Sequence, residues 1–193
     1  MPKRTFISRE EKRAPGFKAA KDRFTFFLGG NANSDLKLKP LLVYYAQTAR
    51  AMKGVLKYSL PIIWEFNKKS WITRDIFQNW FTTHFCPFVK RYCELNNFEP
   101  KALLLLDNAP SHPINLSDLK TRVSVEIIFL SPNTTSLIQP MAQGVIANFK
   151  LHYLRRTFQQ LIDKTEDGDK ETILQFWEKY NILDAIGNID VTW

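Results

Sequence analysis

Residues 101–113 read KALLLLDNAPSHP, an apolar run that ends at a carboxylate and then turns. Four consecutive leucines leave no polar face, so the run predicts a central strand of an α/β sheet that is covered on both faces. Pro110 and Pro113 prevent the strand from continuing. Asp107 would then lie beyond the carboxyl end of this strand, where open α/β sheets bind their ligands. The position also suits an Asx turn, so a catalytic and a purely structural Asp107 both remain open.

The composition indicates one folded domain with a basic surface. The chain has 193 residues, of which 45% are hydrophobic and 13% aromatic, and this is enough for a sizeable core. Its net charge of +8 favours a polyanionic partner such as nucleic acid. Cys86 and Cys93 lie about two turns apart in a predicted helix, roughly 10 Å along its axis and too far for a disulfide. No apolar run is long enough to span a membrane and no signal-type core follows the N-terminus, so we expect a cytosolic or nuclear protein.

The N-terminal half predicts an arm, a hairpin and a long helix. Residues 1–22 are polar and basic, and they predict an extended arm that either follows a phosphate backbone or is simply solvated. The β-type runs over 24–28 and 36–45 surround a Gly/Asn-rich turn and predict a hairpin. The mixed pattern over 46–70 predicts a long connection with one short strand. Apolar residues recur every three or four positions over 72–92, which predicts an amphipathic helix that its internal proline kinks.

The C-terminal half predicts one further strand followed by helices. Residues 123–130 are rich in β-branched side chains and predict a strand. Apolar positions over 145–162 trace a long helix, with Lys150, Arg155 and Arg156 on its polar side. These three cations are candidates for phosphate contacts, and a solvated helix face is the alternative. Shorter helical pieces are expected at 115–121, 171–180 and 182–189. Since no repeat or second core is evident, we expect residues 23–193 to form one domain behind the arm.

Three motifs resemble a known family. The run LLLLDNAPSHP, a β-branched strand and then SPNTTSLIQPMAQGVIANFK resemble the DDE superfamily of endonucleases, in the pogo/Tigger-like branch of the mariner transposases and the nuclear proteins derived from them. Similar segments extend over nearly the whole chain, and the combination of DNAPSHP with PNTTSLIQPM is specific. The resemblance implies an RNase H-like fold, in which a mixed sheet flanked by helices presents three acids. These acids hold two divalent ions, Mg²⁺ or Mn²⁺, for phosphodiester cleavage.

The resemblance implies that Asp107 is the second acid of this triad. The third acid is replaced, because the family's QPM-Asp-QGV run corresponds to residues 139–145 and places Ala142 at the acid's position. The first acid belongs to a strand that would precede the present chain, so we expect only a weak metal site at Asp107 and no cleavage. Asn108 is expected to orient the turn beside Asp107. His112 is expected either to contact a phosphate or metal or to cap the loop.

In RNase H-like sheets that first strand is the central one, so we expect the sheet to be divided. The hairpin and the leucine strand would each expose an unpaired edge, which favours self-association. We therefore expect marginal stability, and a cooperative high-temperature melting transition of a purified monomer would contradict this.

The sequence thus predicts a transposase-derived, DDE endonuclease-like domain that binds DNA in the nucleus and has lost cleavage. An active Mg²⁺-dependent endonuclease remains an alternative, with another acid replacing the missing pair. A non-enzymatic interaction module or a decayed transposon fragment is the other alternative.

Overall fold

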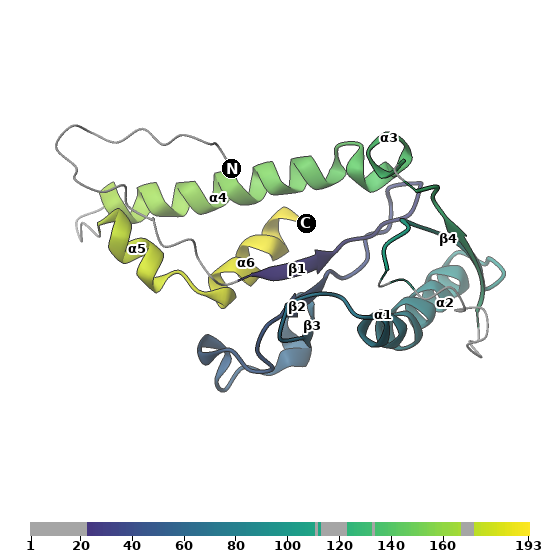
Figure 1. Ribbon diagram of the computed structural model, residues 1–193, viewed down its shortest axis with the longest axis horizontal. Coiled ribbons are helices and arrows are strands. Elements are labelled where there is room, and N and C mark those ends of the chain that lie inside the picture. Colours follow the sequence, from purple (N-terminus) through teal and green to yellow (C-terminus); the bar gives the residue numbers. More distant parts are fainter. Residues whose placement is uncertain (1–22, 111, 113–122, 133, 167–171) are drawn as a thin grey trace.

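The computed structural model describes residues 23–110, 112, 123–132, 134–166 and 172–193. The expected arm over 1–22 and the expected helical turn over 115–121 lie outside these residues. The described chain contains five strands and a set of helices, which Figure 1 shows from one side. It is a mixed α/β structure, as the sequence predicts.

The strands form two small sheets. In the first sheet β1 (Phe24–Phe27), β2 (Leu41–Tyr44) and β3 (Ile63–Phe66) lie in that order, with β1 antiparallel and β3 parallel to β2. In the second sheet β4 (Lys101–Leu106) pairs in parallel with β5 (Ser124–Phe129). Within the described residues, β1 and β4 each pair along one edge, and no strand joins the two sheets.

The predicted hairpin is confirmed by β1 and β2, and β3 is the short strand expected within 46–70. The hairpin turn closes where the backbone N of Leu38 donates to the carbonyl of Gly29 at 2.9 Å. A Cβ at Gly29 would lie 2.7 Å from Cδ1 of Leu38, so a larger residue there would require the flexible Leu38 side chain to move. Two 3₁₀ helices, η1 (Arg50–Met52) and η2 (Lys57–Ser59), connect β2 to β3.

The predicted long helix is present but interrupted. It consists of α1 (Arg74–Trp80), a π-helical turn labelled η3 (Phe81–Phe85) and α2 (Cys86–Leu95), and the hydroxyl of Thr73 caps its first turn. Pro87 has no N–H, so it cannot donate to the carbonyl four residues earlier. The π-helical turn ends two residues before Pro87, so the regular α-helix is interrupted where the kink was expected.

The C-terminal half confirms the long helix and the two shorter ones. The long helix is α4 (Val145–Glu166), and the shorter ones are α5 (Ile173–Lys179) and α6 (Ile182–Thr192). Two short helical turns precede α4, namely α3 (Thr135–Ile138) and η5 (Pro140–Ala142). Capping boxes begin α5 at Thr172 and α6 at Asn181, which fixes where each helix starts. In Figure 1 the long α4 lies alongside α5 and α6.

β2 is the strand that is buried on both faces. Leu41 and Val43 belong to a core cluster with α1 and α2, whereas Leu42 and Tyr44 belong to a second cluster with α4 and α6. None of the four side chains is more than 4% exposed. Helices therefore cover both faces of the first sheet.

β4 is covered on one face only, so the prediction that its leucines are buried on both faces is wrong. Leu104 and Leu106 pack into the cluster with α1 and α2, but Leu103 is 57% and Leu105 48% exposed. Ile128 of β5 is exposed on the same sheet. The physical reason is that the described helices pack against one side of this two-stranded sheet and leave the other side open. The term "open face" below means Leu103, Leu105 and Ile128.

Candidate functional site

Asp107 is the first residue after β4. The backbone N of Leu130, just after β5, donates a hydrogen bond to the carbonyl of Leu106 at 2.8 Å. The loop after β4 begins at the next residue, Asp107. The Asp107 side chain is partly buried. The structure therefore places this carboxylate at the carboxyl end of a parallel strand, as the sequence predicts.

His112 is the polar partner of Asp107. The ring is buried, and its Nδ1 lies 2.9 Å from the backbone carbonyl oxygen of Asp107 and 3.1 Å from Oδ1 of the same residue. A carbonyl oxygen only accepts, so Nδ1 carries the proton in this contact. The Oδ1 atom is buried and forms no regular hydrogen bond within the described chain, although Nδ1 lies beside it. His112 thus closes the loop after β4 back onto Asp107.

Aromatic side chains from two distant segments hold His112 in place. Its ring centroid lies 4.7 Å from that of Phe77 in α1 and 6.1 Å from that of Phe27 in β1. The Nε of Arg74, also in α1, donates to the carbonyl of Pro110 at 3.4 Å. The loop after β4 is therefore packed against α1 and β1. This geometry favours the loop-capping role that was one of the two expected for His112.

Two other predicted residues, Asn108 and Ala142, are exposed. Asn108 is exposed on the loop, and Ala142 is exposed in η5 just before α4. Among the described residues, Asp107 is brought into polar contact with His112 and with none of the other predicted residues. Ala142, the position at which the third acid was expected, lies just before the long helix α4. Its methyl group offers no ligand atom to a cation.

The three predicted cations of α4 differ in their surroundings. Lys150 and Arg155 are exposed. Arg156 is tied to α6, because its Nε donates to Oδ1 of Asn188 at 3.0 Å. Lys150 and Arg155 are therefore better placed for a phosphate than Arg156 is.

The described residues do not form a magnesium or manganese site. No group of three or more His, Cys, Asp or Glu side chains lies close enough together to hold a metal ion in the described part of the chain. Mg²⁺ requires several oxygen ligands in octahedral geometry. Asp107 supplies one carboxylate, and the Nδ1 of His112 beside it is a donor, so this donor set does not fit the ion.

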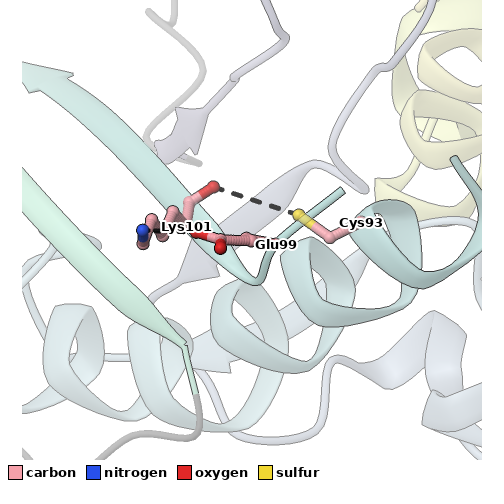
Figure 2. A network of polar contacts seen from close by, with 3 residues as sticks. All are labelled: Cys93, Glu99 and Lys101. Atoms are coloured by element: carbon pink, nitrogen blue, oxygen red, sulfur yellow. Dashed lines mark hydrogen bonds and ion pairs between the residues drawn. The ribbon is translucent and has the colours of Figure 1, made fainter. Parts of the chain in front are cut away.

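The start of β4 is fixed by a contact that the sequence did not reveal. Figure 2 shows Sγ of Cys93, near the end of α2, directed at the carbonyl of Lys101 at 3.9 Å, while Lys101 pairs with Glu99. Cys93 and Cys86 are both buried, and neither forms a disulfide. Cys93 thus contributes to the packing of α2 against β4, and Cys86 belongs to the same core cluster.

A buried polar network around Asn188 was also missed. Asn188 is 1% exposed, and its Nδ2 lies within hydrogen-bonding distance of Thr157, Gln160 and Tyr180 at 3.2, 2.9 and 3.1 Å. The hydroxyl of Tyr180 lies 2.9 Å from that of Tyr153, and burial raises the pKa of Tyr153 above its usual range. The network joins α4 to α6 and to the chain between α5 and α6. A single asparagine in a helix gives no pattern from which it could have been found.

Comparison with known families gives a match over most of the chain. The family described as DDE superfamily endonuclease matches residues 21–193. The chain belongs to the DDE superfamily endonuclease family. This confirms the resemblance drawn from the DNAPSHP and PNTTSLIQPM motifs.

This DDE domain is similar to Tigger transposable element-derived proteins and to Jerky proteins. It is 33% identical over 204 residues to human Tigger transposable element-derived protein 7, covering 100% of the chain and 37% of that protein. It is 33% identical over 142 residues to the human Jerky protein homolog, covering 72% of the chain and 25% of that protein. The mouse Tigger transposable element-derived protein 4 is 27% identical over 193 residues, which is 100% of the chain and 34% of the relative.

The DDE domain thus spans between a quarter and somewhat more than a third of these relatives. No solved structure is significantly similar to it. In the part of the chain that the structure describes, no helix combines the length and apolar character needed to cross a bilayer.

Proposed function

We propose that this transposase-derived, DDE endonuclease-like domain binds DNA in the nucleus and does not cleave it. The observation that carries the proposal is that His112 is the polar side chain beside Asp107, while the described residues contain no group of three or more side chains able to hold a metal ion. Cleavage by two metal ions requires several carboxylates that flank the scissile phosphate. Ala142 removes one of them, because the acid of the family's QPM-Asp-QGV run is absent at this position.

DNA binding is supported by charge, which does not depend on the lost acids. The chain carries a net charge of +8, and α4 presents Lys150 and Arg155 on its exposed surface. Cations of this kind contact phosphates and release bound counterions, so binding weakens steeply as salt rises. The names of the relatives support the transposon origin, and a nuclear location follows from a role on DNA.

The division into two sheets supports the RNase H-like assignment in more detail. In that fold a further strand lies between the hairpin and the strand that carries the second acid. We propose that the free edges of β1 and β4 are the two edges that such a strand would join. Among the described residues neither edge has a strand partner for its backbone N–H and C=O groups, which also favours self-association of the chain.

The salt dependence of DNA binding tests the proposal. Fluorescence anisotropy with a labelled duplex should show an affinity that falls about 10³-fold between roughly 50 and 200 mM salt. Each phosphate contact contributes about 0.9 to the slope of log K against log salt, so Lys150→Gln with Arg155→Gln should lower the slope by nearly 2. Lys90→Gln is a control of the same chemistry, since Lys90 pairs with Glu94 on α2 at 3.4 Å. Undetectable or salt-independent binding would contradict the proposal.

A protein-interaction module is a second candidate, and one observation favours it. The open face places three large apolar side chains in contact with water on one small sheet. Such patches often mark interaction sites. If the chain binds no DNA at low salt, this candidate becomes the better one.

A further inference from the structure

The turn between β3 and α1 carries an exposed tryptophan among cations. Trp71 is 64% exposed, and Lys68, Lys69 and Arg74 are exposed around it in the chain. The ammonium of Lys69 lies 5.6 Å from the centroid of the Trp71 ring. The exposed indole offers a ligand a large apolar surface with cations on either side of it in the sequence.

The backbone of this turn is well ordered by hydrogen bonds. Asn67 is anchored to the first sheet, because its N donates to the carbonyl of Tyr44 at 2.8 Å. The Oδ1 of Asn67 accepts from the N of Lys69 at 2.8 Å, and its carbonyl accepts from the N of Ser70 at 2.7 Å. Ser70 is buried in the left-handed region at φ 56°. Trp71 therefore projects from a fixed turn, which reduces the entropy lost when a ligand binds.

The turn is adjacent to the loop that follows Asp107. Arg74 follows Trp71 by three residues and donates to the carbonyl of Pro110 on that loop. One helical turn further along α1, Phe77 packs against His112. The first turn of α1, three residues after Trp71, is therefore in direct contact with this loop.

Two acids also lie on these segments. Glu65 of β3 accepts from Nδ2 of Asn79 at 3.1 Å, and Asp75 is in the first turn of α1. Lys68, Lys69 and Arg74 outnumber them, so the local charge remains positive.

We propose that Trp71 stacks on an unpaired base of a nucleic-acid strand while Lys69 and Arg74 contact the adjoining phosphates. The inference rests on the proposed function and goes beyond it, because it names an unpaired strand as the ligand and Trp71 as the stacking residue. Exposed aromatic rings beside cations are the usual means of binding single strands, since every base has a face that can stack. Lys69 lies 5.6 Å from the ring centroid, and the 64% exposure of Trp71 leaves most of the side chain accessible to a base.

The test compares single and double strands on the full chain. Fluorescence anisotropy would measure binding to a labelled oligothymidylate, to the corresponding oligouridylate and to a DNA duplex. Trp71→Ala should weaken binding of the single strands about tenfold and of the duplex less than about twofold. Trp71→Leu keeps an apolar side chain but lacks an aromatic face, so it should weaken single-strand binding to a similar extent. Trp177→Ala is the matched control, because Trp177 is an exposed tryptophan on α5.

The outcomes separate this inference from the proposed function. If the unmodified chain binds the oligonucleotides and both Trp71 variants bind them equally well, the inference is wrong and DNA binding stands. If the unmodified chain binds neither single strands nor the duplex, both are wrong. Equal losses in the Trp71 and Trp177 variants would also overturn the inference, because they would show an unspecific effect.

Discussion

β2 and β4 are both runs of consecutive apolar residues, yet the fold treats them differently. All of β2 is buried, whereas the side chains of β4 alternate between the core and the open face. In the described part of the chain, β2 has a strand on each side and helices over both faces, while β4 has one strand partner and helices over one face. The comparison shows that an apolar sequence alone does not determine whether a strand is buried on both faces. Burial also depends on which other elements pack against each face.

The largest expected effect on stability is the difference between replacing a buried leucine of β2 and replacing an exposed leucine of β4. Leu42→Ala should lower the free energy of unfolding by about 3 kcal/mol, because it leaves a cavity between the first sheet and α4 and α6. Leu103→Ala should lower it by less than about 1 kcal/mol, because little buried contact is lost. Urea unfolding of the two variants gives the comparison. Equal losses would show that the open face is covered in solution.

A smaller effect is expected from the polar network that supports the helical cover of β2. Asn188→Ala should destabilise the fold by about 2 kcal/mol, because Thr157, Gln160 and Arg156 each lose a hydrogen-bond partner. The exposed Asn33 provides a matched Asn33→Ala control with an expected change within about 0.5 kcal/mol. The same urea titration measures both. If the network contributes no stability, the two variants will have the same free energy of unfolding.

The smallest change in stability is expected at the open face, where the effect should be on association. Replacing Leu103 and Leu105 by lysine should change the free energy of unfolding by less than about 1 kcal/mol but reduce self-association, since it places charge on the apolar patch. Sedimentation velocity over a concentration series measures this. Leu56→Lys changes an equally exposed leucine outside the second sheet and should leave association unaltered. Association that is identical in all three proteins would argue against the open face as its cause.

Local patterns were sufficient to predict most elements. The prolines after Asp107 mark the end of β4, and the spacing of apolar residues predicts α4. The same spacing does not distinguish a regular helix from one with a π-helical turn, so the form of the break before Pro87 was not predictable. A proline indicates only that a bond is missing.

Features that depend on distant segments were not predictable from local patterns. Leu103 is exposed because the described helices pack against the other face of β4. The four leucines themselves do not indicate which face the helices cover. The setting of His112 depends on Phe27 and Phe77, which come from separate elements. The position of Asp107 was predictable because a strand and the turn after it are local features. Which of its two expected roles His112 has was not predictable.

Whether Asp107 still supports cleavage is tested most directly by nicking of supercoiled plasmid DNA with Mg²⁺ and with Mn²⁺. The full chain and its Asp107→Ala variant should give the same background, because a single carboxylate paired with His112 cannot hold two metal ions. Metal-dependent nicking by the unmodified chain that disappears in Asp107→Ala would contradict the loss of cleavage and identify an active endonuclease.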